Sequence, residues 1–213
     1  DFINNNKGQL RYSQNARQAI DNTFSYTNYD NLGRIQEVGQ DNLPGSLTAL
    51  DPLASQLSAT RNENTQTVYT QPATGISYNG KPQRFLRNRV SYTYTLNQNG
   101  DREYTYYSYD PHGNVEWLLQ EIQGFSRTSV AYEYDLISNK VLQAIFNQGR
   151  KDQFFHRYSY DNDDRITLTE TSRDGIVWDK DASYAYYLHG PLKRTGFGED
   201  RVQGMDYAYT IQG

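Results

Sequence analysis

The chain has 213 residues, a formal net charge of −4, no cysteine and 36% hydrophobic residues, and its mean hydropathy is −0.91. This length fits one domain or a piece of a larger protein. Without cysteine there is no disulfide framework, thiolate metal site or cysteine nucleophile. The 21 basic and 25 acidic residues are spread along the sequence, so we expect no nucleic-acid binding. No apolar run approaches the roughly 18 residues of a membrane helix, so we expect no membrane insertion.

Aromatic residues make up 14% of the chain, with 20 tyrosines, 8 phenylalanines and 2 tryptophans. Disordered chains of this polarity are poor in aromatic residues, so we expect a folded protein. The opening sequence DFINNNKGQL lacks the basic and apolar regions of a signal peptide. We expect the chain to be a fragment of a much larger one.

The first clear element is a β-hairpin around Tyr29-Asp30-Asn-Leu-Gly33-Arg34-Ile35. The Asp30 side chain can accept a hydrogen bond from the backbone two residues on. Gly33 can take a positive φ at no steric cost, and Ile35 starts the return strand. This order of residues predicts a type I turn with a G1 bulge.

The middle of the chain is less regular. Residues 41–67 contain no aromatic residue, and we predict an irregular insertion there with a short helical turn near 52–57. Gly33 and Gly113 are 80 residues apart, about three repeat lengths, which predicts degenerate copies between them. Apolar and aromatic alternation on both sides of residues 97–100 predicts another hairpin.

The C-terminal half repeats the tyrosine motif. Its second tyrosines are separated by steps of 25, 26, 26 and 23 residues, and such a fixed period indicates a repeat architecture. The two rings of each Tyr-x-Tyr pair should share one strand face, because side chains alternate along a strand. The motif residues are Tyr107, Tyr109, Asp110 and Gly113; Tyr132, Tyr134 and Asp135; Tyr158, Tyr160, Asp161 and Arg165; Tyr184, Tyr186 and Gly190; and Tyr207 and Tyr209.

Single copies of the motif differ in the residues or the length of their turns. Asp164 replaces the turn glycine, and aspartate tolerates the left-handed region better than most residues. Residues 136–140 make one loop a residue longer. We expect Arg34 and Arg165 to pair with carboxylates of the turns or of neighbouring strands. Residues 172–175 form the turn of a further predicted hairpin.

The repeated Tyr-x-Tyr-Asp-x-x-Gly-Arg-Ile unit resembles the repeat of the RHS family, whose members are also called YD-repeat proteins. Asp30, Gly33 and Arg34 all match it in one copy, and the resemblance is weakest over residues 41–89. The chain departs from the pattern at Asn114 and Pro191 in place of arginine, and at Tyr187 and Thr210 in place of aspartate.

The resemblance implies an all-β, non-catalytic protein. Residues 1–213 would be one segment of a spiralling antiparallel sheet of hairpin repeats that wraps into a hollow shell, with an irregular insertion at about 41–67. In bacterial toxins of this kind the shell encloses a C-terminal effector, which is released after self-cleavage in a core domain; here that core would lie beyond residue 213. Relatives include toxin-complex shells and the YD shells of animal teneurins.

The resemblance also implies partners and a location. The partners are the remainder of the shell and the enclosed effector, with secretion machinery or an immunity protein as further candidates. The protein would be secreted or held at the bacterial cell surface, by a type VI, type IX or general secretory route.

Two other classes of function stay open. Tyrosine stripes also occur on carbohydrate-binding surfaces, so an adhesive glycan-binding surface is the main alternative. A β-rich glycosidase is motivated only by the abundance of carboxylates.

No catalytic residue, cofactor or metal ligand is predicted. Residues 161–164 resemble a calcium loop but lack its glycine and distal glutamate, so a turn is favoured. His112, His156 and His189 are too scattered for a metal site. Residues 195–198 are too short to indicate a nucleotide-binding loop.

Overall fold

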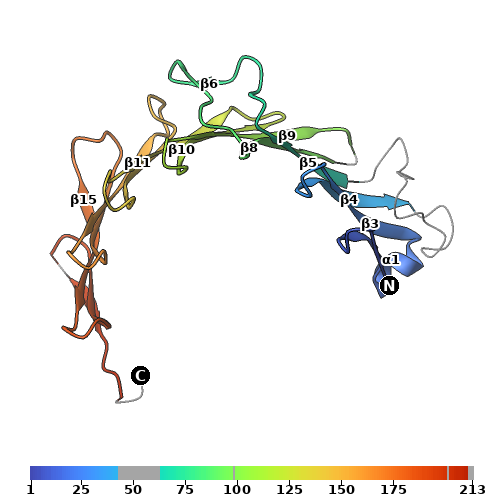
Figure 1. Cartoon of the computed structure of the whole chain (residues 1–213). Coiled ribbons are helices and arrows are strands. Elements are labelled where there is room, and N and C mark those ends of the chain that lie inside the picture. The colour runs from blue at the N-terminus through green and yellow to red at the C-terminus, as the bar shows by residue number, and fades with distance from the viewer. Residues whose placement is uncertain (43–62, 98, 201, 211–213) are drawn as a thin grey trace. The chain divides into compact units, whose positions relative to one another are not determined.

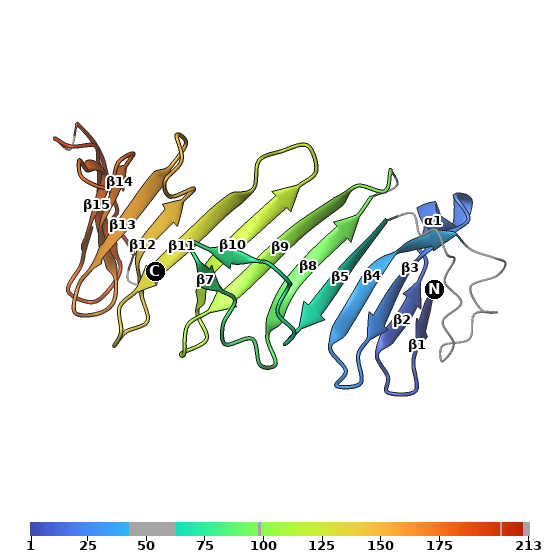
Figure 2. The same cartoon turned by 90° about the horizontal axis from the view of Figure 1, so that it is seen from above.

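The computed structural model describes residues 1–42, 63–97, 99–200 and 202–210. These residues confirm the predicted all-β fold class. Antiparallel strands form a 15-stranded sheet in which sequence neighbours are sheet neighbours, and β6 and β7 form a separate two-stranded hairpin (Figure 2). Within the described residues no helix is long and apolar enough to cross a membrane.

The elements up to the middle of the chain include the one described helix. They are β1 (Phe2–Asn4), β2 (Leu10–Ser13), α1 (Ala16–Ile20), β3 (Thr23–Tyr29), β4 (Ile35–Asn42), β5 (Glu63–Tyr69), β6 (Ser77–Tyr78), β7 (Lys81–Pro82), β8 (Val90–Leu96) and β9 (Arg102–Tyr109).

The remaining elements are strands joined by short turns. They are β10 (Val115–Ile122), β11 (Thr128–Tyr134), β12 (Val141–Phe146), β13 (Phe154–Tyr160), β14 (Ile166–Ser172), β15 (Asp179–Tyr186), β16 (Leu192–Phe197) and β17 (Gln203–Asp206).

The chain divides into two compact units. The first comprises Asp1–Ser108 with Leu119–Arg127, and the second comprises Tyr109–Leu118 with Thr128–Gly213. In the first unit Tyr12, Phe24 and Tyr26 form a buried cluster, in which the rings of Tyr12 and Phe24 meet edge to face at 5.5 Å.

The second unit has its own buried face. Ala131 pairs with Ile145, and Ile145 pairs with Phe155, so these side chains follow one another across three strands. All three are buried. Trp178, from the loop after β14, packs edge to face on Phe155 at 6.4 Å. These buried apolar residues therefore lie on the face opposite the tyrosine pairs.

The predicted insertion at 41–67 is wrong at both of its ends. β4 continues to Asn42 and β5 begins at Glu63, so the flanking residues belong to strands. The reason is that the partner strand supplies what this stretch lacks: Gln66 pairs with Tyr94, and Thr65 pairs with Thr95. The helical turn predicted near 52–57 lies outside the described residues.

The spacing of the repeats between Gly33 and Gly113 also differs from the prediction. Between the β3–β4 and β9–β10 hairpins the described part of the sheet contains β5 and β8, which form one hairpin rather than several degenerate copies. The connection over residues 70–89 adds length without adding a strand to this sheet. It carries β6 away from the sheet surface (Figure 1).

Helix α1 was not predicted. Asn15 caps it: its side chain accepts from Gln18 N at 2.8 Å, and the Gln18 side chain accepts in return from Asn15 N at 3.0 Å. This reciprocal pair is a capping box, so the sequence Asn-x-x-Gln held a usable signal.

Candidate functional site

Each repeat turn is organised by the side chain of its first residue. In the first complete motif, Asp30 Oδ1 accepts from the backbone N–H groups of Leu32 and Arg34 at 2.9 Å each. Asp30 Oδ2 accepts from Arg34 Nε at 2.7 Å. The Asp30 backbone N–H donates to the Arg34 carbonyl, and Gly33 N donates to the Asp30 carbonyl, both at 2.9 Å. With φ of +79° at Gly33, this is the predicted bulged turn.

The turn at Asp161 repeats this arrangement. Asp161 Oδ1 accepts from the backbone of Asp163 and Arg165 at 2.9 and 3.0 Å, and Oδ2 accepts from Arg165 Nε at 2.8 Å. Asp164 takes the glycine position with φ of +61°, as predicted. The predicted pairing of Arg34 and Arg165 with turn carboxylates is confirmed. These residues form a turn, in which the chain itself uses both oxygens of Asp161.

Copies that depart from the motif keep the turn by other means. Asn114 replaces arginine and donates from Nδ2 to Asp110 Oδ2 at 2.9 Å, beside Gly113 with φ of +101°. The turn from Tyr187 to Pro191 has no carboxylate and is closed by backbone bonds of 2.8 and 3.0 Å.

The turn after Asp135 is one residue longer, as predicted. Asp135 N donates to the Lys140 carbonyl at 2.8 Å, and Asn139 takes the left-handed position with φ of +57°. The Asp135 carboxylate accepts from Ile137 N and from both the backbone and the hydroxyl of Ser138.

In six repeats the tyrosine at the end of the outgoing strand binds the previous repeat. Tyr29 Oη donates to the Leu10 carbonyl at 2.9 Å, where Leu10 is the first residue of the preceding return strand. We call this bond the tyrosine latch. It recurs from Tyr69 to Ile35, Tyr134 to Val115, Tyr160 to Val141, Tyr186 to Ile166 and Tyr209 to Leu192, at 2.8–2.9 Å.

The residue at the arginine position adds a second link between repeats. The Arg34 guanidinium lies 4.0 Å from the ring centroid of Tyr69, and that of Arg165 lies 4.6 Å from the ring of Tyr186. In the first repeat Gln9 takes this position and donates to the Gly33 carbonyl at 3.0 Å. In these three repeats a side chain of the turn therefore also contacts the next repeat.

The first tyrosine of each pair behaves differently. Tyr132 and Tyr134 share a face with ring centroids 6.2 Å apart, as the alternation predicts. The Tyr134 hydroxyl makes the latch, whereas that of Tyr132 has no hydrogen-bond partner among the described residues. The hydroxyls of Tyr107, Tyr158 and Tyr184 likewise have none there, and all four rings are half-buried. Tyr109 ends β9, and Tyr207 lies beyond β17, with its carbonyl accepting from Tyr187 Oη at 2.8 Å.

The turn carboxylates are held in their ionised form. The side-chain hydrogen bond from Arg165 is the main cause that lowers the pKa of Asp161. At Asp30, desolvation would raise the pKa, but hydrogen bonds from the backbone and side chain of Arg34 outweigh it and lower the pKa. Burial raises the pKa of the latch tyrosines Tyr134, Tyr160 and Tyr186, so they remain proton donors.

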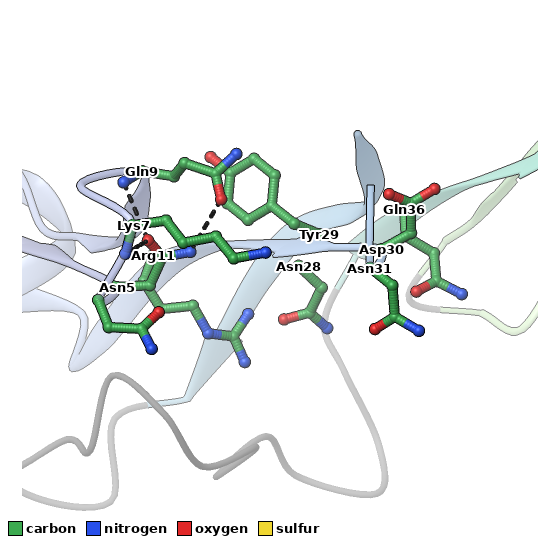
Figure 3. A pocket seen from close by; sticks show the side chains of 10 residues that line it. Asn5, Lys7, Gln9, Arg11, Asn28, Tyr29, Asp30, Asn31 and Gln36 are labelled. Carbon is green, nitrogen blue, oxygen red and sulfur yellow. Dashed lines mark hydrogen bonds between the residues drawn. The ribbon is translucent and has the colours of Figure 1, made fainter. Parts of the chain in front are cut away.

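A polar concavity of about 480 Å³ lies beside the first two turns (Figure 3). Its lining is rich in amides and includes Arg11, whose Nη1 donates to the Thr27 carbonyl at 2.7 Å. Asn28 also lines it, and its buried Oδ1 has no partner in the described part of the chain. Tyr29 contributes the aromatic surface.

A smaller hollow of about 290 Å³ is apolar. Val130, Ala144, Phe146, Phe154 and His156 line it, on the tyrosine face of the second unit. Ala144 pairs with both Tyr132 and His156, so a small side chain forms the hollow between larger ones.

The histidines are separated in the structure. His156 contacts Phe154 edge to face at 5.0 Å, His189 stacks on Tyr187 at 5.4 Å, and His112 is exposed in its turn. Among the described residues no group of three or more His, Asp or Glu side chains is arranged to hold a metal ion.

The roles of two side chains in the repeats were not predicted from the sequence. Tyr69 makes a latch although no aspartate follows it. Asn5 organises a turn, with Oδ1 accepting from Lys7 N and Gln9 N at 3.0 Å each. Asparagine offers the same acceptor as aspartate, so an Asn-x-x-Gly search would have found it.

No protein-family model matches the chain, and no curated protein matches it significantly. Two solved structures are similar over most of its length. The Photorhabdus luminescens Tc holotoxin pore with a mutated TccC3 has 12% identity and a TM-score of 0.43, over 91% of this chain and 12% of that one. A TcdB2-TccC3-Cdc42 complex has 13% identity and a TM-score of 0.41, over 92% of this chain and 11% of that one. The chain spans only about an eighth of these proteins, and likeness at this level assigns no function.

Proposed function

We propose that this chain is a segment of the β-shell of a large RHS or YD-repeat protein, a non-catalytic wall that encloses a C-terminal toxin or effector. The recurring tyrosine latch is the observation that carries the proposal. Every latch joins one hairpin to the next at the same position, which is what a wall extended by identical steps requires. Self-closing turns linked in series give a sheet that grows without a solid core.

The composition supports the same role. A wall needs one apolar face only, because the other face can meet polar contents or water. Here the apolar face of the second unit carries Ala131, Ile145 and Phe155, while the tyrosine face exposes partner-free hydroxyls. Apart from the apolar hollow between Val130 and Phe154, this face is polar, which suits an enclosed chain that must later leave. The effector, the rest of the shell, an immunity protein and secretion machinery are the partners that this role requires, and the protein would act outside the cell that makes it.

The test uses the full-length protein that contains this segment, with its C-terminal region. A triple variant Tyr134→Phe, Tyr160→Phe and Tyr186→Phe removes three latches, and its matched control Tyr132→Phe, Tyr158→Phe and Tyr184→Phe removes three hydroxyls without partners. Limited trypsin digestion should leave the C-terminal region intact in the wild type and the control, and cleave it in the latch variant. Rapid digestion of that region in the wild-type protein would contradict enclosure.

A glycan-binding surface is the second candidate, and the polar concavity favours it. Amides, a guanidinium and a tyrosine ring are groups that bind sugars, and all three kinds line this concavity. A glycan array should give a signal that Asn31→Ala abolishes. Asn162→Ala, at the same turn position of another repeat, is the matched control. A blank array with the folded protein would rule out this candidate.

A further inference from the structure

One short segment of the first unit carries an unusual charge. Lys81, Arg84, Arg87 and Arg89 lie within residues 81–89, which we call the basic loop, and no acidic residue occurs between Glu63 and Asp101. Taking these four charges from the 21 basic residues leaves 17 against 25 acidic residues, a net charge of −8 for the rest of the chain. The basic loop is therefore a local positive site on an acidic protein.

The basic loop is fixed to the sheet by a buried amide. Gln83 is only 8% exposed, and its Nε2 donates to the Ser91 and Tyr107 carbonyls at 2.8 Å each. Its Oε1 accepts from Ala73 N at 2.7 Å. The next residue donates from its backbone to Ser108 Oγ at 3.0 Å. Bonds to two strands and to its own connection hold the loop in one conformation.

Phe85 is displayed by this scaffold rather than buried. It is 44% exposed and has φ of +53°, a left-handed conformation that is rare for a bulky residue and costs free energy. Arg89 Nη1 donates to its carbonyl at 2.8 Å, and the Arg84 guanidinium lies 5.8 Å from its ring centroid. Leu86, the neighbouring apolar residue, is buried instead. Strain of this kind persists where the surrounding structure holds it, and it concentrates at functional positions.

Two arginines close to Phe85 in the sequence are exposed. Arg84 lies beside the Phe85 ring, and Arg87 follows two residues later and makes no hydrogen bond or ion pair with the described residues. Arginine and aromatic residues are enriched at protein–protein interfaces, and arginine is among the residues that contribute most to binding energy. Rigidity also reduces the entropy cost of binding.

We propose that the basic loop is a docking surface for an acidic peptide segment of a partner protein. Carboxylates of the partner pair with Arg84 and Arg87, and an apolar side chain between them packs on Phe85. Charge complementarity favours this occupant, because carboxylates match the guanidinium fork. A long polyanion such as nucleic acid needs an extended basic stripe, and here the positive charge is confined to one loop while the rest of the chain has a net charge of −8. The proposal does not depend on the shell function.

The experiment measures binding of a short fluorescent peptide of alternating glutamate and leucine to the folded 213-residue chain by anisotropy. The same peptide with glutamine in place of glutamate is the probe control. The double variant Arg84→Gln/Arg87→Gln should weaken binding about tenfold, as loss of interface anchors does. Arg173→Gln, an exposed arginine in another loop, should leave it unchanged.

The variant Phe85→Gly distinguishes the contribution of the aromatic ring to binding from its contribution to the loop conformation. Glycine accepts the positive φ without strain, so this variant keeps the loop and loses only the aromatic contact. Binding should again fall about tenfold, with unchanged far-ultraviolet circular dichroism.

Four results would overturn the proposal. Two concern the peptide: equal binding of the glutamine peptide, and unchanged binding in both loop variants. The third is tighter binding of single-stranded DNA or phosphatidylserine vesicles than of the peptide. The fourth is self-association that is lost in Arg87→Gln, which would assign the loop to contact with a second copy of this chain.

Discussion

The two tyrosines of each motif have different physical roles although they share a strand face. The hydroxyl of the second tyrosine donates to the carbonyl of the first residue of the preceding return strand, as Tyr160 does to Val141. The first tyrosine lies two residues further from the turn, and its hydroxyl has no hydrogen-bond partner among the described residues. Removing an oxygen from each should therefore have different consequences for stability.

Tyr160→Phe should lower the free energy of unfolding by about 0.5–1.5 kcal/mol, because it removes the hydrogen bond to the Val141 carbonyl and leaves that group unpaired. Tyr158→Phe, in the same strand, should change it by less than about 0.5 kcal/mol. Urea unfolding followed by circular dichroism gives both values. Equal losses in the two variants would contradict the assigned latch.

Acid should weaken the repeat turns. The pKa of Asp161 is lowered from 3.8, chiefly by the side-chain hydrogen bond from Arg165. A carboxyl with a lower pKa in the folded than in the unfolded chain stabilises the fold fully above the unfolded value. This contribution is lost as pH falls below about 3.8 and through the folded pKa.

Urea midpoints between neutral pH and the acid limit test this expectation. Wild type should lose stability below pH 4 more steeply than Asp161→Asn, which cannot titrate there. Asp200→Asn, at an exposed turn aspartate, should follow the wild-type curve. An acid limb that Asp161→Asn leaves unchanged would show that this turn does not contribute.

At the scale of the elements, the sequence predicted what is local. Asp30, Gly33 and their equivalents predicted the hairpin turns. The hydrogen bonds of the aspartate side chain, the positive φ and the bulge all lie within five residues, so the local sequence determines them. The latch could not be predicted, because a tyrosine's acceptor depends on which strand lies beside it. Tyr69 shows this: it finds Ile35 across 34 residues, past a segment with no motif.

The long connection between β5 and β8 was beyond sequence patterns for a related reason. Its conformation depends on Gln83 reaching two backbone carbonyls of the sheet, and glutamine has no local signature for such a role. The positive charge of the basic loop can be seen in the sequence. The net charge of the whole chain does not reveal it, because that total is negative.

Gln83→Leu should detach this connection. Leucine fills a similar volume but leaves the Ser91 and Tyr107 carbonyls and the Ala73 N–H without their partner, and buried groups of this kind cost about 1–3 kcal/mol each. Hydrogen exchange should accelerate over residues 70–89.

The second unit provides the internal reference for that experiment. Amides of β13 should exchange at the wild-type rate, because each repeat depends mainly on its neighbours. Gln71→Leu, at an exposed position of the same connection, is the matched control and should change neither region. Uniform acceleration in both units would show that Gln83 stabilises the whole fold instead.

At the scale of the molecule, the sheet is a series of nearest-neighbour pairings with two outer strands, β1 and β17. All four residues of β17 are exposed, and within the described part of the chain it pairs with β16 alone. An outer strand presents unpaired N–H and C=O groups to other chains. Each added repeat stabilises its neighbour, but the sheet still ends in outer strands that can pair with the outer strands of another copy.

Met205→Lys should reduce self-association of the 213-residue chain. Met205 is 51% exposed in β17, and a lysine there would place like charges together when two such edges meet. Sedimentation velocity over a range of concentrations should show less oligomer than for wild type or for the control Met205→Leu. Phe2→Lys makes the same change in β1, where Phe2 is 78% exposed, and the double variant should be the most monomeric. If association persists equally in all of them, copies meet through a sheet face or a loop rather than through the outer strands.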